Sequence, residues 1–353
     1  MYAVLVIIYK LLMKEVFVMI RIKDIAERAG VSPTTVSNVI HGNRKKVSAE
    51  TIEKIESIIR ETNYVPSMGA RLLAGNHSNI IGVIMGGGKQ TPGILDPFIG
   101  SLLSAIELEI YKYGYYMMFH MAKSSEENLY LTTAWNVDGL VTLGLTLEDN
   151  LYIQTQGNIP VVAVDGYFKE EKIGNIGLDD FDGGYQMAKH LIENGHTDFL
   201  FLSDENIGVN YYRWLGVKEA FKEAGIPIAD DHHVIIPQGK EERLKFHEKN
   251  MKKYLEHTAL FFTSDFYAVE AITFFAKHGI SVPDKISIAG FDNSIYATII
   301  HPALTTVKQD ISMKGSLAVE HLVKMIKEES RETFNVKLPV SLVIRDSVKT
   351  IYR

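Results

Sequence analysis

Four side chains share one side of a short predicted helix: Pro33, Thr34, Ser37 and Asn38. They are small and mostly polar. Hydroxyl groups of Thr and Ser can hydrogen-bond to bases or phosphates, and an Asn amide can form two hydrogen bonds with adenine. Such a surface suits a helix that lies in the major groove of DNA, and Ser32, just before the helix, is a further candidate contact.

A first helix and a tight turn must position this surface. The helix is expected at residues 23–29, where one apolar face is formed by Ile22, Ile25, Ala26 and Ala29. Gly30 ends the helix, because Gly tolerates the left-handed backbone found at helix ends. Val31 then turns inward and fills the angle between the two helices.

The second helix carries the polar surface. Ser32 is a good N-cap, and Pro33 is a good first residue because its missing N–H would have had no partner there. On the same helix Val36 and Ile40 are expected to pack inward. The second helix therefore begins at Pro33 and presents its polar side to solvent.

A third helix is expected at residues 48–61, with Ser48 as its N-cap. Its apolar side is formed by Ile52, Ile55 and Ile59. The turn before it is basic and suits phosphate contact, and it consists of Asn43, Arg44, Lys45 and Lys46. An ordinary helical hairpin with a solvated charge run is the alternative, but caps, turn, periodicity and charge together favour a DNA-binding helix-turn-helix.

The segment 22–38, which reads IKDIAERAGVSPTTVSN, resembles the head of the lac-repressor-like (LacI/GalR) family of bacterial transcription regulators. Similar family motifs are NYVP at 63–66, ARLLAG at 70–75, GFDN at 290–293, PALTTVKQD at 302–310 and LPVSLV at 338–343. The resemblance implies a small all-α helix-turn-helix head. A hinge helix would join it to an α/β two-lobed body like that of a type I periplasmic binding protein.

The resemblance also implies how head and body cooperate. Ala70, Arg71 and Leu73 match hinge positions that contact the minor groove, where Leu73 wedges into the central base step. A homodimer would place two recognition helices on the halves of a pseudo-palindromic operator. An effector that closes the lobes would change the hinge spacing, as inducer or as corepressor. The alternative for Leu73 is that it covers the adjacent lobe.

Two features depart from the family pattern, and a third bears on the oligomeric state. Asn38 stands where many relatives carry Arg, so the preferred base is expected to be adenine instead of guanine. The run GGG at 86–88 stands where many relatives place side chains against the effector, and it lacks the spacing of a phosphate-binding loop. No leucine heptad tail follows the last predicted strand, which favours a dimer over a tail-bundled tetramer.

Composition fits a soluble globular protein with a basic head. The chain has 353 residues, of which 46% are hydrophobic and 23% charged, and it contains no cysteine. Disulfide and thiol chemistry are therefore excluded, which is compatible with a reducing cytoplasm. The net charge is −6, yet residues 19–76 carry nine Lys/Arg against six Asp/Glu. The DNA-binding surface is therefore expected at the N-terminus of an acidic body.

Four segments are predicted. Residues 1–18 are apolar, but charges interrupt them too often for a membrane span and they lack the signals of a secretory leader. We interpret them as a start-site extension, with Met19 as the natural start and Met1 as the alternative. The helix-turn-helix domain is assigned to 19–66, the hinge helix to 67–76, and the effector-binding and dimerisation domain to 77–353.

In the body, apolar runs typical of strands alternate with helical stretches, which predicts parallel sheets covered by helices on both faces. Strands are expected at 80–85, 115–119, 139–143, 161–164, 199–202, 234–236, 260–263 and 286–290. Helices are expected at 98–113, 181–194, 212–224, 241–254 and 268–278. The length favours two sheets. By analogy with the family, lobe 1 holds 78–178 and 309–338, and lobe 2 holds 179–308 and 339–353.

Charged residues stand where such sheets bind ligands, at the carboxyl ends of strands facing the cleft between lobes. Asp165 and Asp292 each follow a predicted strand, and Arg213 opens the helix after another. All three match family positions that contact the effector. Carboxylates and a guanidinium suit a polyhydroxylated or carboxylated ligand, with a sugar or sugar derivative preferred. The alternatives are helix caps for the aspartates and a surface charge for Arg213.

Three further residues near these strand ends either contact the ligand or have a structural role, as a helix cap or in the core. Ser264 and Asp265 follow the strand at 260–263, where the family commonly has Asn-Asp or Ser-Asp. Asp265 either caps the next helix or contacts the ligand. Phe98 matches an aromatic residue that often lines the cleft, or it belongs to the core.

The sequence lacks the signatures of other functional classes. The chain has no Gly-x-Ser-x-Gly, no Walker-type loop and no His-Glu-x-x-His, so we expect no enzyme and neither cofactor nor metal. His232 and His233 are adjacent and point in different directions, in a loop expected to be exposed, which disfavours zinc. A two-lobed sugar-binding transport or sensing protein is the main alternative. The helix-turn-helix and the missing secretory signal disfavour it, and the expected location is the cytoplasm.

Overall fold

The computed structural model of the chain describes residues 20–40, 42–64, 77–86, 93–122, 124–168 and 172–351. They belong to two compact units, of which the first ends at Ser78 and the second begins at Asn79. The predicted hinge helix at 67–76, with Ala70, Arg71 and Leu73, lies outside the described residues. So do the extension at 1–18 and Gly87 and Gly88 of the glycine run.

The N-terminal unit is helical in its described part. It contains α2 (Ile22–Ala29), α3 (Pro33–Ile40), the 3-10 turn η1 (Arg44–Lys46) and α4 (Ala49–Thr62). Gly30 ends α2 with φ of 73°, and the Val31 N–H donates to the Ala26 carbonyl at 3.0 Å. Ser48 caps α4, because its Oγ accepts from the Thr51 N–H at 3.2 Å.

A small apolar core holds these helices together. Its buried members are Ile25, Ala26, Ala29, Val36, Val39, Ile55 and Ile58. Ile40, expected to face inward, is only half-buried, and Val39 takes the inner position beside Val36. Val39 and Ile40 lie three and four residues after Val36, and both spacings place a residue on the same helix face. The apolar pattern therefore did not decide which of the two is buried.

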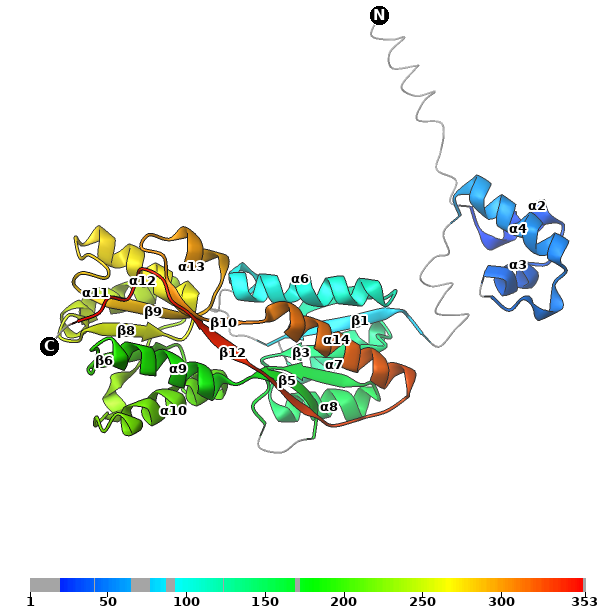
Figure 1. The fold of residues 1–353 in the computed structure, drawn as a ribbon. Coiled ribbons are helices and arrows are strands. Elements are labelled where there is room, and N and C mark those ends of the chain that lie inside the picture. The colour runs from blue at the N-terminus through cyan, green and yellow to red at the C-terminus, as the bar shows by residue number, and fades with distance from the viewer. Residues whose placement is uncertain are drawn as a thin grey trace, which may run out of the picture. The chain divides into compact units, whose positions relative to one another are not determined.

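The C-terminal unit is built on two six-stranded sheets that form two lobes (Figure 1). The lobe 1 sheet contains β1 (Ile80–Met85), β2 (Tyr116–Met121), β3 (Gly139–Leu143), β4 (Val161–Val164), β5 (Gly174–Leu178) and β11 (Asn335–Leu338). The lobe 2 sheet contains β6 (Phe199–Ser203), β7 (His233–Ile235), β8 (Ala259–Phe262), β9 (Ser287–Asp292), β10 (Thr305–Gln309) and β12 (Val340–Val343). The strand orders are β11-β5-β4-β3-β1-β2 and β12-β10-β9-β8-β6-β7. Among the described strands every neighbouring pair is parallel except β10 with β12.

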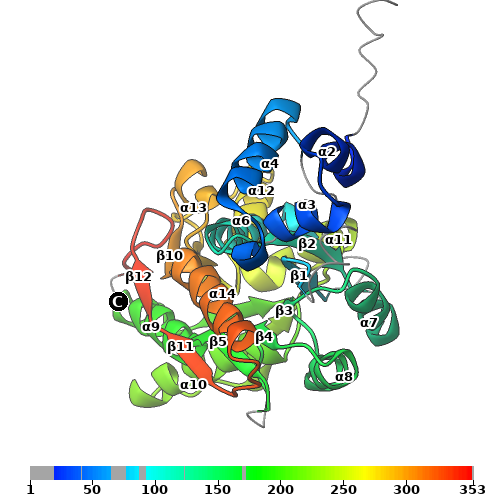
Figure 2. The same cartoon turned by 90° about the vertical axis from the view of Figure 1, so that its right-hand side faces the viewer.

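Helices cover both faces of the lobe 1 sheet (Figure 2). They are α6 (Pro97–Lys112), α7 (Ser125–Ala134), α8 (Leu147–Gly157) and α14 (Ile311–Lys327), with the short turn η2 (Gly93–Leu95) before α6. Side chains of β1 alternate between the two faces: Ile81 and Val83 pack in the cluster with α6 and α14, while Ile80 and Ile84 pack in the cluster with α8. This alternation explains why all of β1 is apolar, since both faces of a covered parallel strand are buried.

The lobe 2 sheet is covered in the same way. Its helices are α9 (Asp180–Glu193), α10 (Gly208–Glu223), α11 (Lys240–Tyr254), α12 (Asp265–Lys277) and α13 (Ile295–Ile299), with the turn η3 (Asp230–His232) before β7. Helices α9 and α10 pack against each other closely at Gly184, where an added Cβ would lie 2.0 Å from the Arg213 carbonyl oxygen. Close backbone contact therefore positions the helix that carries Arg213.

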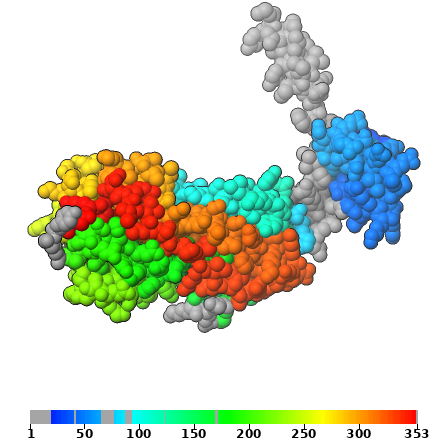
Figure 3. All heavy atoms as spheres, in the orientation of Figure 1, coloured from blue at the N-terminus to red at the C-terminus, as the bar shows by residue number. Residues whose placement is uncertain are grey.

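The chain passes between the lobes three times, after Leu178, Gln309 and Leu338, where consecutive elements belong to different lobes. The C-terminal part, coloured orange to red, consequently lies on both lobes (Figure 3). Every helix among the described residues is too short or too polar to span a lipid bilayer. The arrangement brings residues near Asp165, Gln309 and Asp292 to the junction of the two sheets.

Candidate DNA-reading surface and interlobe site

The polar side of α3 is oriented by a cap at one end and by buried valines behind it. Ser32 Oγ accepts from the Thr35 N–H at 3.1 Å and lies 2.9 Å from Thr35 Oγ1, so Ser32 caps the helix. Val36 and Val39 are buried, while Pro33 and Thr34 are exposed. Ser37 and Asn38, the other two predicted contacts, are half-buried. Thr34 and Asn38 are four residues apart and therefore share one side of α3.

The basic turn follows α3 directly. The Asn43 N–H donates to the Asn38 carbonyl at 2.8 Å, which ties the turn to the end of the helix. Arg44 forms an ion pair with Glu56 of α4, with 2.7 Å between Nη2 and Oε1, whereas Lys45 and Lys46 are exposed. An Arg side chain has five N–H donors, so Arg44 keeps donors for a phosphate while paired with Glu56.

Two of the predicted effector residues, Asp165 and Asp292, are linked by a chain of polar contacts that we call the interlobe network. The Lys314 Nζ lies 2.8 Å from both carboxylate oxygens of Asp165 and 2.8 Å from Oε1 of Gln309. The Gln309 amide in turn donates to Oδ1 of Asp292 at 2.6 Å. The network therefore runs from the end of β4 in lobe 1, through α14 and the crossover at Gln309, to the end of β9 in lobe 2.

The network is buried at its centre. Lys314 has 0% exposure, and its Nζ lies 5.3 Å from the centre of the Phe98 ring, which is half-buried. Burial raises the pKa of Asp292 well above its ordinary value, and Asp265 and Asp96 add to the shift while Arg213 opposes it. Asp165 and Asp292 adopt positive φ angles, 54° and 111°, that non-Gly residues seldom adopt. Strained backbone of this kind often occurs at functional sites.

Arg213 is buried, with 6% exposure, so the alternative of a surface charge is wrong. Its Nε donates to Asp180 Oδ1 at 2.7 Å and its Nη1 donates to the Thr263 carbonyl at 2.5 Å. The guanidinium carbon lies 3.5 Å from the centre of the Phe291 ring. Burial raises the pKa of Asp180 to about 6, although Arg213 lowers it.

Asp180 and its neighbour Tyr167 belong to this site, and sequence reasoning missed them. The Tyr167 hydroxyl donates to Oδ2 of Asp180, and its ring stacks on Tyr212 with 4.7 Å between ring centres. Tyr167 follows β4 of lobe 1, whereas Asp180 and Tyr212 belong to α9 and α10 of lobe 2. The position of Asp180 at the start of a helix after a crossover was the signal that could have identified it.

Ser264 and Asp265 are engaged within lobe 2. Ser264 caps α12 by accepting from the Phe266 N–H at 3.1 Å, so the alternative in which Asp265 caps this helix is wrong. Asp265 is buried and accepts from the Thr306 hydroxyl at 2.5 Å and from the Ser294 N–H at 2.6 Å. Burial raises its pKa to about 7. Asp265 thus joins α12, β10 and the segment after β9, because its two oxygens face two different elements.

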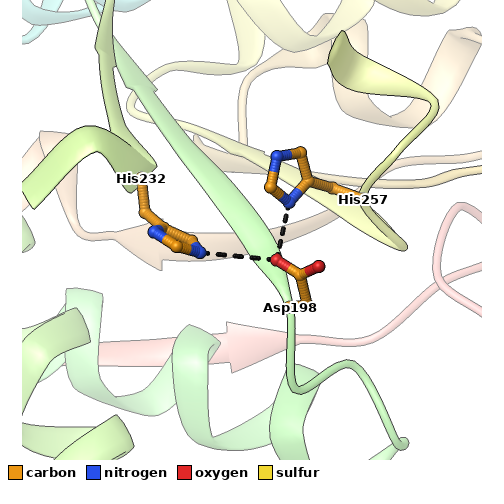
Figure 4. A group of neighbouring side chains, drawn as sticks. All are labelled: Asp198, His232 and His257. Carbon is orange, nitrogen blue, oxygen red and sulfur yellow. Dashed lines mark hydrogen bonds and ion pairs between the residues drawn. The ribbon is translucent and has the colours of Figure 1, made fainter. Parts of the chain in front are cut away.

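The two adjacent histidines have different surroundings. His233 begins β7 and is half-buried, so the expectation of an exposed loop is wrong at this residue. Its Nε2 lies 2.6 Å from the Ser203 Oγ, because β7 pairs with β6, and burial lowers its pKa to about 4. His232 instead faces Asp198 and His257 (Figure 4). This grouping was missed because the three residues are far apart in the sequence.

A helix-turn-helix unit and a two-lobed body of parallel sheets define the class of ligand-responsive transcription regulators. Residues 21–67 match the family of bacterial regulatory proteins, lacI family, and residues 188–348 match a periplasmic binding protein-like domain. The transcriptional repressor PurR of Histophilus somni (strain 129Pt) is 32% identical over 343 residues, covering 94% of this chain and 100% of its own. The chain therefore belongs to the lacI family.

Other relatives agree with this assignment. The regulator DegA of Bacillus subtilis (strain 168) is 31% identical, covering 94% of this chain and 98% of its own. The lac repressor dimer bound to operator and the anti-inducer ONPF superposes with a TM-score of 0.80 at 26% identity, covering 94% and 99% of the two chains. A LacI family regulator from Enterococcus faecium with bound ribose gives 0.68 at 26%, covering 77% and 100%. The predicted fold class is confirmed, and the protein is a transcriptional regulator, not an enzyme or a transport protein.

Proposed function

We propose that the outward side of α3 reads an operator through Thr34, Ser37 and Asn38, with the basic turn on the phosphates. The observation that carries this proposal is that Ser32 and the buried valines orient these side chains away from the core. The Asn38 amide has a donor and an acceptor that match an adenine edge. The lac repressor structure, which contains operator DNA, supports the same role for this chain.

Selection of bound sequences from a random duplex library tests this proposal. The purified chain should enrich a pseudo-palindrome with adenine at one position of each half-site. Asn38→Ala should then lower affinity for the enriched duplex about tenfold or more and relax the preference at that position. Glu53→Ala, on the exposed surface of α4, is the matched control. Enrichment of no sequence, or equal affinity of Asn38→Ala, would contradict the proposal.

The effector is proposed to bind at the interlobe network, against Asp165, Arg213 and Asp292. Four aspartates, Asp165, Asp180, Asp265 and Asp292, surround two cations here, Arg213 and Lys314, so hydrogen-bond acceptors are plentiful. Hydroxyl groups donate to carboxylates, so a neutral polyhydroxylated ligand fits better than an anionic one. A sugar meets this requirement, and the Enterococcus faecium relative holds ribose. Phe98 and Ser264 complete the candidate contacts.

Ligand binding at this place would act on both lobes. A hydroxyl that donates to Asp292 competes with the Gln309 amide, and one that donates to Asp165 competes with Lys314. Because these contacts connect the lobes, a ligand that replaces them favours one lobe arrangement over another. The ligand then binds the two lobe arrangements with different free energies, and this difference couples effector binding to operator binding.

A thermal-shift screen over sugars, nucleosides and sugar phosphates should identify the effector. A neutral sugar is expected to raise the melting temperature, and Asp292→Asn should abolish that rise. Asp284→Asn, an exposed aspartate of lobe 2, is the control and should keep it. A ligand response that survives in Asp292→Asn would show that the site lies elsewhere. Adding the ligand to the operator assay then distinguishes inducer from corepressor.

The hinge and the dimer complete the proposal. Ala70, Arg71 and Leu73 are proposed to enter the minor groove of the operator in a homodimer. The lac repressor structure, a dimer bound to operator, supports the homodimer. Leu73→Ala should weaken binding to the selected operator and leave the effector response intact. Unchanged operator affinity in a gel shift would refute the wedge. The regulator is proposed to act in the cytoplasm, where its operator DNA is found.

A further inference from the structure

A group of three side chains lies at the end of the lobe 2 sheet where its parallel strands begin. We call it the Asp-His-His cluster, and it consists of Asp198, His232 and His257. His257 Nδ1 lies 2.6 Å from Asp198 Oδ1, and His232 Nε2 lies 3.4 Å from the same oxygen. Figure 4 shows both rings turned toward the carboxylate. The three potential ligand atoms all lie within 4.8 Å of one another.

The sheet topology explains how distant residues meet. Asp198 immediately precedes β6, His232 immediately precedes β7, and His257 comes two residues before β8. Since β6 pairs in parallel with both β7 and β8, the residues before these strands lie side by side. The cluster is therefore at the opposite end of the sheet from Asp292, which ends β9. It belongs neither to the effector site nor to the DNA-reading surface.

We propose that the Asp-His-His cluster binds Zn²⁺. Two imidazole nitrogens and a carboxylate oxygen are ligands that zinc prefers, and a tetrahedral ion requires them about 3.3 Å apart. Asp198 Oδ1 lies 3.4 Å from His232 Nε2, which meets this requirement, and 2.6 Å from His257 Nδ1, while no two of the three ligand atoms are more than 4.8 Å apart. The ion therefore requires side-chain shifts that lengthen the contact between Asp198 and His257. The Asp198 side chain is 52% exposed, which leaves a fourth position open to water.

A second carboxylate lies beside one of the ligands. Asp231 Oδ1 is 3.3 Å from Nδ1 of His232 but forms no hydrogen bond with it, and the Asp231 side chain is 81% exposed. Its negative charge favours a cation near the ring. Nε2 of His232 is the nitrogen that faces Asp198. His233 contributes no ligand, because its own Nε2 contacts Ser203 on another side of the strand.

Bound zinc would fasten β7 to the lobe 2 sheet. β7 has only three residues and lies at the edge of its sheet, so it has one neighbouring strand among those described. Three ligands from the starts of three strands would hold these strand ends together. Because zinc needs the folded arrangement of ligands, it should stabilise the native protein by mass action. We expect no effect on operator affinity.

Isothermal titration of ZnCl₂ into the EDTA-treated, dialysed full chain tests the proposal. One equivalent per chain should bind and should raise the melting temperature, while Mg²⁺ at the same concentration should do neither. His232→Gln, His257→Gln and Asp198→Asn should each lower zinc affinity by more than about tenfold. His301→Gln removes an exposed imidazole elsewhere in lobe 2 and should leave affinity unchanged.

Cobalt gives an independent readout, since tetrahedral Co²⁺ absorbs visible light far more strongly than octahedral Co²⁺. The wild-type chain should show the strong absorption, and His257→Gln should lose it. Melting temperatures measured without metal show which variants remain folded, and any folded one of the three decides the outcome. Absence of a zinc equivalent, or equal zinc affinity in a folded ligand variant, would overturn the proposal.

Discussion

Lys314 provides a direct measure of how strongly the interlobe network stabilises the body. Its Nζ is fully buried and contacts two acceptors, Asp165 and Gln309, each at 2.8 Å. Lys314→Met keeps most of the buried volume and removes the charge. Removing one partner of a buried ion pair costs about 3–5 kcal/mol, since the other charge is left uncompensated.

The structure places the expected cost near the lower limit. The Asp165 side chain retains 19% exposure, so water partly solvates its carboxylate after the substitution. We therefore expect Lys314→Met to lower the free energy of unfolding of the body by about 3 kcal/mol. The double variant Lys314→Met/Asp165→Asn leaves no unpaired charge and should recover about half of this loss or more. Lys308→Met, an exposed lysine of β10, should change stability by less than about 0.5 kcal/mol.

Urea denaturation followed by circular dichroism measures the wild type, these three variants and the single variant Asp165→Asn under one condition, and the double-mutant cycle isolates the coupling between the two charges. A loss below about 1 kcal/mol for Lys314→Met would mean that the ion pair is weak despite its burial. A double variant no more stable than Lys314→Met would mean that the stranded charge is not the cause. Either result would refute the electrostatic explanation of the network.

Three further predictions concern packing, capping and pH. Gly184→Ala should destabilise the body by about 3 kcal/mol in thermal unfolding, because the added Cβ would lie 2.0 Å from backbone. Gly100→Ala is the control: its Cβ would have its nearest contact at 3.6 Å, so it should be neutral or slightly stabilising. Ser32→Ala removes the α3 cap and should cost about 1 kcal/mol in urea unfolding of the head, and no loss would show that the cap is dispensable. Burial lowers the pKa of His247 to about 4, so the unfolded chain takes up a proton first and stability falls as pH drops from about 6.5 to 4. His247→Gln should remove up to about 3 kcal/mol of that fall, and an unchanged pH profile would contradict it.

The head was predictable from sequence because its determinants are local. Gly30, Ser32, Pro33 and Ser48 act within one helical turn of their own position, and the helix boundaries agree within one or two residues. The choice between Val39 and Ile40 as the inner residue was not local, since it depends on where α4 packs. Short-range patterns thus predicted the helices but not every contact between them.

The body was predictable in kind but not in every element. Apolar runs predicted the strands now seen as β1, β3 and β4 at their observed limits. The elements that were not predicted are β5, β10, β11, β12, α7, α8, α13 and α14. β5 contains two glycines, and α7 has Leu129, Tyr130 and Leu131 in one run instead of at helical spacing, so neither shows the expected periodicity. The chain returns from lobe 2 to lobe 1 after Gln309, and only this return buries α14 against the lobe 1 sheet.

Taken by itself, the sequence determined the helix-turn-helix, the alternating α/β body and the positions of Asp165 and Asp292 at strand ends, since caps, turns and periodicity act over a few residues. Arg213, expected to open a helix, lies inside α10 instead. Only the tertiary structure decided what these residues touch. Lys314 meets Asp165 across 149 positions of chain, and Asp198 meets His257 across 59. Strand order and crossovers create such contacts, and no local pattern records them, because their free energy depends on burial and distance in the folded chain.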